Sequence, residues 1–195
     1  MNVDFATVYN MMLRSFSEPR EVAEELTSRR LDRGTLWSIM ALVVVVSALV
    51  VTVSSLVSPP TPELAPLMGT PFLAALVIGA SQVVLVFVLY FTGRMMGGTG
   101  HFPETIMLIA WHQGMTVFLQ IITLAISIVS PLFGGLISLF GAFYLFYVLL
   151  QFIDVLHGFK SLAKAFGTFA FGVVGIGLGL AVMLSLIGVS AATVS

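Results

Sequence analysis

The chain has 195 residues, of which 58% are hydrophobic and only 9% are charged, with a formal net charge of −1 and a mean hydropathy of +1.10. In soluble domains roughly a quarter of all residues are charged, so this composition excludes a water-soluble globular protein. The chain has no cysteine, which excludes disulfides, thiol nucleophiles and thiolate metal sites.

Residues 1–34 form a first segment that we expect to be cytoplasmic and helical. A helical wheel places five apolar side chains within roughly 80° of one another, namely Phe5, Val8, Tyr9, Met12 and Phe16. Pro19 would restart a second helix, and Gly34 would end it before the first span. The segment is interpreted either as a membrane-surface or partner-docking helix, or as a short helix that covers the cytoplasmic ends of the bundle.

Four stretches contain no Asp, Glu, Lys or Arg, and each exceeds the roughly 20 residues that an α-helix needs to cross a bilayer; they are 34–62, 64–93, 105–153 and 165–195. As one helix, residues 105–153 would extend roughly 73 Å, so this stretch must fold back. Ser130-Pro131, followed by Gly134-Gly135, supplies the break. The sequence therefore predicts an all-α polytopic integral membrane protein, whose domain at 35–195 has five transmembrane helices at about 35–57, 72–92, 103–128, 132–156 and 162–188.

The basic residues predict the orientation of these spans, because Lys and Arg are retained on the cytoplasmic side. With five spans, all eight fall on one side; they are Arg14, Arg20, Arg29, Arg30, Arg33, Arg94, Lys160 and Lys164. The loop from Ser58 to Pro71, the turn near Ser130 and the C-terminus carry none. We therefore expect a cytoplasmic N-terminus, an external C-terminus and a first span that is an uncleaved anchor rather than a signal peptide.

The loop before the third span contains Gly97, Gly98 and Gly100. A phosphate-binding loop would need a Lys and a Ser or Thr after its last glycine, and a dinucleotide-binding pattern would need glycine where Pro103 stands. The three glycines are instead interpreted as a tight cytoplasmic turn with positive-φ geometry, and Pro103 as the start of the next helix. Anion binding by the exposed amides is the alternative.

Polar side chains follow helical spacing along the third and fourth spans. Gln113, Thr116, Gln120, Thr123 and Ser127 lie within about 80° on one face of the third span, and Tyr144, Tyr147, Gln151 and Asp154 share a face of the fourth. Unsatisfied polar atoms in hydrocarbon cost several kcal/mol, so interhelical hydrogen bonds are expected between the two helices. The predicted intramembrane polar seam comprises His112, Gln113, Thr116, Gln120, Thr123, Tyr147, Gln151, Asp154 and His157.

Two ionisable residues of this seam have alternative interpretations. Asp154 is a functional candidate because it lies inside an apolar span, or a structural partner of His157, Arg94 or Lys160. His112 is either bonded to a neighbouring helix or a proton relay or ligand. Asp154, His157 and Glu104 are too scattered for a metal site, and the sequence shows no linked catalytic set. We therefore expect no metal, no cofactor and no catalytic residue.

The fifth span carries a strip of small residues within about 60° of one another, in which another helix could approach closely; the strip comprises Thr168, Gly172, Gly175 and Gly179. The last three are predicted helix-packing positions. Packing within the chain and contact between two copies are both consistent with the strip.

Several short motifs stand in a fixed order along nearly the full chain: Glu18-Pro19-Arg20, the turn Gly97-Gly98-Thr99-Gly100-His101-Phe102, Trp111 with Gln113, and His157-Gly158-Phe159. In this order the chain resembles the Ypt-interacting protein (YIP) domain family, and particularly its bacterial members. The resemblance implies a five-helix integral membrane protein, here of the bacterial cytoplasmic (inner) membrane, with a periplasmic C-terminus. Eukaryotic relatives bind prenylated Rab-type GTPases, but this chain lacks the Asp-Leu-Tyr-Gly-Pro motif that those relatives carry.

Three classes of function can be compared with these observations. The first is a non-enzymatic membrane protein that organises or recruits membrane components or partners. The second is a channel or transporter for a small solute, ion or lipid that uses the polar seam between the third and fourth spans. The third is an intramembrane enzyme, for which the sequence lacks a linked nucleophile and base. The expected partners are membrane lipids, a second copy of the chain and a protein bound at the N-terminal segment, and no nucleic acid.

Overall fold

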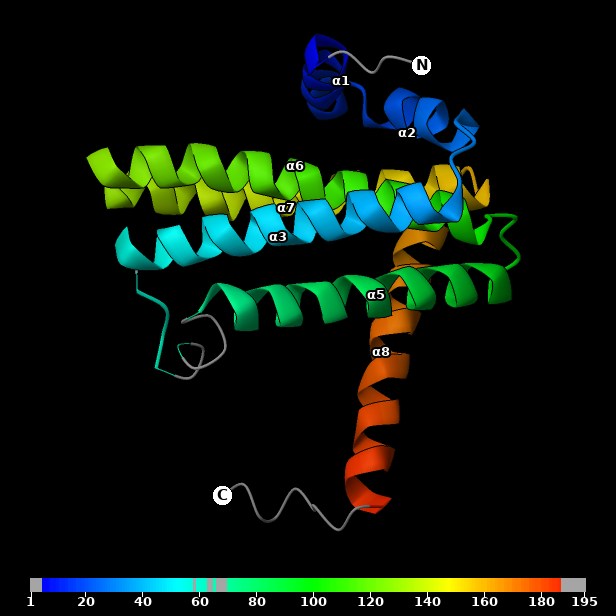
Figure 1. Ribbon diagram of the computed structural model, residues 1–195. Coiled ribbons are helices and arrows are strands. Elements are labelled where there is room, and N and C mark those ends of the chain that lie inside the picture. Colours follow the sequence, from blue (N-terminus) through cyan, green and yellow to red (C-terminus); the bar gives the residue numbers. More distant parts are fainter. Residues whose placement is uncertain (1–4, 58, 63–64, 66–69, 187–195) are drawn as a thin grey trace.

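The structure of the protein is a computed structural model, which describes residues 5–57, 59–62, 65 and 70–186. Regular structure in this part of the chain is entirely helical (Figure 1), with α1 Phe5–Ser17, α2 Pro19–Ser28, α3 Arg33–Val57, α5 Pro71–Met95, α6 Phe102–Val129, α7 Pro131–His157 and α8 Leu162–Leu186. The five long helices are apolar enough to cross a membrane, which confirms the predicted all-α, five-span fold. Much of the predicted external loop, the last two residues of the predicted fifth span and the C-terminus lie outside the described residues.

The helix boundaries follow local chemistry. Ser130 ends α6 and Pro131 begins α7, which is the break predicted from the sequence. The Thr70 hydroxyl caps α5 by accepting a hydrogen bond from the amide of Leu73. The expectation that Gly34 ends the second helix was wrong. Gly34 lies in the first turn of α3. The Asp32 side chain caps this helix, which therefore begins at Arg33, before the glycine.

Four of the long helices, α3, α5, α6 and α7, run side by side (Figure 1). The central helix is α6, which packs against α3, α5 and α7, whereas α3 and α7 pack mainly on α6 rather than on each other. The first half of α8 packs on α5 and α7. Beyond that contact α8 crosses the other long helices steeply and stands clear of them (Figure 1).

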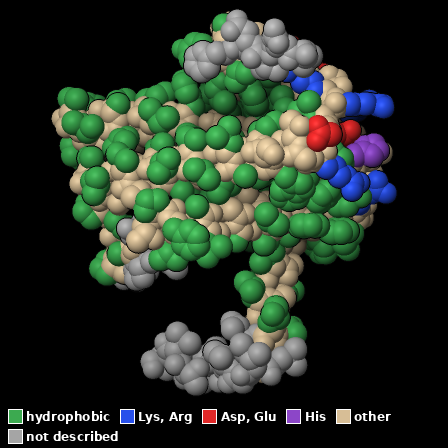
Figure 2. Space-filling view, in the orientation of Figure 1, with side chains coloured by type: hydrophobic (Ala, Val, Ile, Leu, Met, Phe, Trp, Pro, Cys, Tyr) green, Lys and Arg blue, Asp and Glu red, His purple; other side chains and the backbone are tan. Residues whose placement is uncertain are grey.

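The two ends of the bundle differ in chemistry. Charged side chains gather at one end (Figure 2), where α2, the turn before α6 and the loop after α7 meet; we call this the charged end, and the end near Ser130 the distal end. The hydrophobic core lies toward the charged end, where Leu89, Ile106 and Phe152 are fully buried. At the distal end, large apolar side chains such as Val129 and Phe133 are exposed, as expected for a surface that faces lipid.

The short helices α1 and α2 lie over α6 and α7 (Figure 1). One face of α2 is completely buried against these two helices, and it comprises Pro19, Val22, Ala23 and Leu26. The helices α1 and α2 are therefore an integral part of the packed structure.

Candidate functional site

The side chain of His157, the last residue of α7, is buried in a cradle of glycines from two other segments. A Cβ atom added to Gly93 would overlap the imidazole ring, and one added to Gly98 would lie 2.5 Å from Nδ1. A Cβ on Gly100 would lie 2.7 Å from the carbonyl oxygen of Leu156. These glycines are therefore required for close approach to His157, and we call the group Gly93, Gly98, Gly100 and His157 the histidine cradle.

Hydrogen bonds fix the cradle. Nε2 of His157 lies 3.1 Å from the carbonyl oxygen of Leu89, and because a carbonyl can only accept, Nε2 carries the proton. The Thr99 amide donates to the His157 carbonyl at 3.2 Å, and the Gly98 amide donates to the Gly93 carbonyl. Two amides of the glycine turn are thus already engaged, which disfavours the alternative of anion binding there.

Positive-φ geometry is needed at fewer of the predicted positions than expected. Of the three predicted turn glycines only Gly97 has a positive φ, at 85°. Gly158 ends α7 in the left-handed region, with a φ of 64°. Gly98 and Gly100 instead serve the contact with His157, a reason for glycine that the local sequence does not reveal.

The carboxylate of Asp154 is buried, with 1% of its side chain exposed, and it anchors α2 to the bundle. Arg20 of α2 donates to Asp154 at 2.6 Å, and the amide of Ser161 donates to the other carboxylate oxygen at 2.7 Å. The partners expected from the sequence were His157, Arg94 or Lys160. The observed cation is Arg20, 134 positions away in sequence, and we call this pair the α2 anchor.

A second set of contacts holds the end of α1 against α6 and α7. The indole N–H of Trp111 donates to the hydroxyl of Ser15 at 2.9 Å, and the hydroxyl of Tyr144 donates to the carbonyl of Phe16 at 2.6 Å. The rings of Phe16 and Tyr144 stack with centroids 6.3 Å apart. The contacting face of α1 includes the buried residues Met11 and Ser15, whereas Tyr9, which was predicted on this face, is exposed.

The two polar stripes of α6 and α7 do not face each other, contrary to expectation. Tyr144 contacts α1, and Gln151 donates to the exposed hydroxyl of Tyr147 on the same helix. On α6, adjacent residues point in different directions because successive side chains are about 100° apart. Nε2 of His112 lies 3.0 Å from the carbonyl of Leu145 on α7.

Gln113 instead points toward α3 and α5 and is buried. Its amide nitrogen donates to the hydroxyl of Ser47 at 2.9 Å, and its amide oxygen accepts from the side chain of Gln82. This buried trio links α3, α5 and α6 near the middle of the bundle. Ser47 and Gln82 were missed from the sequence, although each is a polar residue in an otherwise apolar span and could have been found on that ground.

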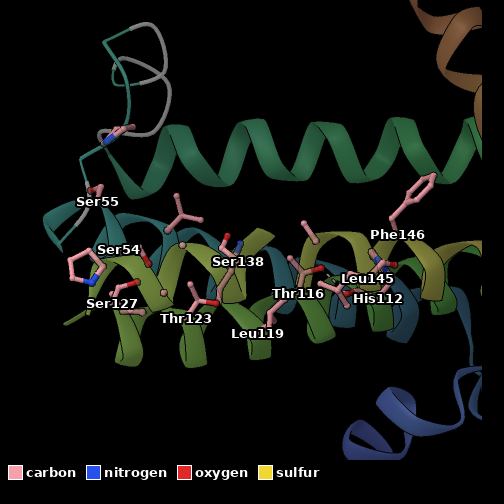
Figure 3. A pocket seen from close by; sticks show the side chains of 18 of the residues that line it. Ser54, Ser55, His112, Thr116, Leu119, Thr123, Ser127, Ser138, Leu145 and Phe146 are labelled. Atoms are coloured by element: carbon pink, nitrogen blue, oxygen red, sulfur yellow. Dashed lines mark hydrogen bonds between the residues drawn. The ribbon is translucent and has the colours of Figure 1, made fainter. Parts of the chain in front are cut away.

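The rest of the α6 stripe lines a groove of about 730 Å³ in the distal half of the bundle. The floor is α6 with Thr116, Gln120, Thr123 and Ser127, and the walls are α3 and α7, which do not close over it. Figure 3 shows the labelled hydroxyl side chains of Thr116, Thr123 and Ser127 following one another along α6. The sequence predicted this floor, but not that the wall residues Ser54, Ser55 and Ser138 add further hydroxyls.

The groove leaves polar atoms without partners. Thr116 donates to the carbonyl of His112 in its own helix. The amide oxygen of Gln120 and the hydroxyl of Thr123 are buried and have no hydrogen-bond partner in the described structure. Such atoms cost about 1–3 kcal/mol each when they stay unpaired, so these two are candidate ligand contacts.

The predicted small-residue strip of α8 divides in two. Gly172 packs closely on Val88 of α5, and the hydroxyl of Thr168, which donates to the carbonyl of Lys164, lies 3.2 Å from the sulfur of Met96. At Gly175 and Gly179 an added Cβ atom would have no other part of the described chain within 4 Å. The first part of the strip therefore packs within the chain, and contact between copies stays a prediction for the second part.

Metal binding finds no support in the residues that the structure describes, which contain no group of three or more His, Cys, Asp or Glu side chains able to hold an ion. Glu104 forms a capping box with His101 at the start of α6 and is not joined to Asp154 and His157 in a common cluster.

Comparison with known protein families finds a match. The family model of the Yip1 domain matches residues 13–184, which include nearly all of the described helices. No curated protein and no solved structure matches the chain. The matched range contains the histidine cradle, the α2 anchor and the groove.

Proposed function

Because the chain belongs to the Yip1 domain family of membrane proteins, we propose that it is a non-enzymatic membrane protein that recruits a partner protein at its charged end. The observation that carries the proposal is the rigid attachment of α1 and α2 to the bundle. Contacts from α6 and α7 hold both short helices, so their outer faces form a fixed surface. A preorganised surface binds with a smaller entropic cost than a flexible tail does.

The outer face of α2 carries glutamates that lie near Arg14, Arg20 and Arg29. Glu21 and Glu24 are exposed, with 67% and 60% of their side chains accessible, while the opposite face is buried. Arg14 lies near Glu18, Glu21 and Glu25 at 3.4–3.7 Å, and exposed pairs of this kind exchange readily with other charges. We therefore infer a partner with a basic surface, for which charge complementarity would supply steering and specificity.

The charged end is placed on the cytoplasmic side in this proposal. All eight basic residues lie in α1 and α2, in the terminal turns of the long helices at that end or in the connections there, and the positive-inside rule favours retention of such segments in the cytoplasm. Large apolar side chains are exposed along the remaining length of α3, α5, α6 and α7, which supports a bilayer around this part of the bundle.

The test uses a photo-crosslinking amino acid placed at Glu21 in the full chain, expressed in membranes of its own host. We expect a discrete protein adduct that falls several-fold on Glu24→Lys and persists on the control Thr7→Lys, which changes an exposed position of α1. The same amino acid at Leu42, a lipid-facing position that is 64% exposed, should yield lipid adducts only. If Glu21 crosslinks no protein in the folded chain, recruitment through α2 is excluded.

A transport function has one specific observation in its favour, the polar groove on α6. Against it, the groove ends at His112, Leu145 and Leu149, and the core packs densely between that point and the charged end. A route across the membrane would require this core to open. Flux in reconstituted vesicles that is lost on Gln120→Leu would favour transport over recruitment.

A further inference from the structure

We propose that the groove on the distal half of α6 binds one uncharged lipid whose head is a hydroxyl group, of the class of diacylglycerols and long-chain alcohols. The inference rests on the shape of the groove, on its unpartnered polar atoms, on its lack of charge and on its depth in the bundle. It is independent of recruitment at the charged end.

The shape of the groove admits a molecule from the bilayer. Its volume of about 730 Å³ is within the range of small-molecule sites, and it is open along the side between α3 and α7. The part of the α7 wall nearest the distal end includes the small, exposed residues Gly135, Ser138 and Ala142. A Cβ atom on Gly135 would meet nothing within 4 Å, so space for a ligand extends up to the backbone of α7.

The polar atoms of the groove require a hydrogen-bonding head. The amide oxygen of Gln120 and the hydroxyl of Thr123 have no partner among the described residues, and both side chains line the groove. A hydroxyl head group both donates and accepts hydrogen bonds. Rotation of the Gln120 or Thr123 side chain toward the groove would therefore give its unpaired atom a partner. A purely hydrocarbon occupant would leave both atoms unpaired, which is unfavourable in a medium without water.

The absence of charge selects the class of head group. None of the residues that line the groove is Asp, Glu, Lys or Arg. The one imidazole, that of His112, already holds the carbonyl of Leu145 through Nε2. A phosphate head group would therefore be buried without a counter-charge, which is strongly unfavourable.

The depth of the polar atoms points the same way. Gln120 lies nine residues before Val129, the end of α6, which is about 14 Å along the helix. A phospholipid head drawn this far from the distal end would leave its aqueous zone, whereas a lone hydroxyl loses little hydration. The apolar chains of the ligand can leave between α3 and α7 and join the surrounding lipid.

The experiment reconstitutes the full chain in phosphatidylcholine vesicles that contain a trace of a diazirine-bearing diacylglycerol or, in parallel, a matched diazirine-bearing phosphatidylglycerol. After irradiation, adducts are mapped by mass spectrometry. We expect diacylglycerol adducts on residues 112–138, and an excess of unlabelled diacylglycerol should prevent their formation. The phosphatidylglycerol probe should not give these displaceable adducts. Equal labelling by both probes, without displacement, would show lipid bound only at the general bilayer interface and would overturn the proposal.

A pair of variants links the labelling to the groove. Gly135→Phe fills open space in the groove without a backbone clash, and Gly177→Phe makes the same change on α8, where a Cβ also meets nothing within 4 Å. The first should reduce specific labelling at least about tenfold, as expected when a site is sterically filled at a cost of about 1.4 kcal/mol or more, and the second should not. Labelling that survives Gly135→Phe contradicts the site.

A second measurement distinguishes lipid from water in the same groove and does not depend on Gly135→Phe folding correctly. The chain has no cysteine, so Thr123→Cys can be treated with a membrane-impermeant maleimide in vesicles. A lipid-filled groove protects this thiol. Rapid labelling would mean that water satisfies Gln120 and Thr123, and the proposal would be wrong.

Discussion

Substitution of Gly93 by alanine tests whether the histidine cradle fixes the charged end. Glycine in the interior of a helix is less favourable than alanine by about 1 kcal/mol, so Gly93→Ala would stabilise an unobstructed α5. In the cradle, however, the new methyl group would overlap the ring of His157. The ring has no free space on its other sides, because Gly98 and Gly100 approach it and Phe159 stacks on it with centroids 5.2 Å apart.

The magnitude follows from the contacts that the ring would lose. Forcing a group into a packed site costs about 1–3 kcal/mol, and displacing the ring leaves the buried Nε2–H of His157 and the carbonyl of Leu89 without each other, at about 1–3 kcal/mol more. After the gain in helix propensity is subtracted, Gly93→Ala should lower the free energy of unfolding by about 1–5 kcal/mol.

The assay is reversible unfolding by SDS in mixed micelles, carried out as a double-mutant cycle with His157→Ala. In the His157→Ala background the methyl group has room, so Gly93→Ala should be neutral or stabilising. Gly177→Ala, at a helical position with open space around it, is the matched control and should not destabilise. The reasoning is refuted if Gly93→Ala destabilises equally in both backgrounds, or if it does not destabilise the unmodified chain.

Three further predictions concern the α2 anchor, α8 and the start of α3. Arg20→Ala leaves Asp154 buried without its cation; because Arg20 is half exposed, we expect a loss of only about 1–3 kcal/mol and faster hydrogen exchange of α2 amides, and unchanged exchange would contradict the anchor. If Gly175 and Gly179 contact a second copy, the double variant Gly175→Leu with Gly179→Leu should lower energy transfer between copies that carry different fluorophores. Unaltered transfer would mean that the two glycines face lipid instead. Hydrogen bonds from the first turn of α3 lower the pKa of Asp32 below its ordinary value, so its stabilising contribution is present above the unfolded pKa and is lost as the pH falls through the folded pKa. Asp32→Asn should remove this acid dependence of the unfolding midpoint, and superimposable pH profiles would argue against the cap.

The spans could be predicted because hydrophobic length and chain breaks are local properties. Residues 105–153 cannot be one helix in a bilayer, and Ser130-Pro131 offers the break that the structure uses. The partner of Asp154 could not be predicted in the same way. Arg20 reaches it because α2 folds back over α6 and α7, and nothing in the sequence near Asp154 encodes that return.

The polar stripe of α6 shows where periodicity stops being informative. Helical spacing correctly places Thr116, Gln120 and Thr123 on one side of α6, where they form the groove floor. Spacing does not say which residues of a neighbouring helix lie beside that face, and the expected pairing with the polar stripe of α7 was wrong. In the structure α3 packs on α6 at one side of the stripe, and the groove lies between α3 and α7.

Glycine has two opposite roles in this chain. At the charged end Gly93, Gly98 and Gly100 are small because atoms of the same chain occupy the space a side chain would need. At Gly135 and Gly175 no such atoms lie nearby in the described part of the chain, and the missing side chain leaves a surface that something else can approach. A glycine that is small for internal packing should resist every larger residue, whereas one that is small for an external contact should tolerate alanine in the isolated chain and change only binding. Stability and binding measurements on Gly98→Ala and Gly135→Ala should therefore give opposite results, which local sequence alone could not have foretold.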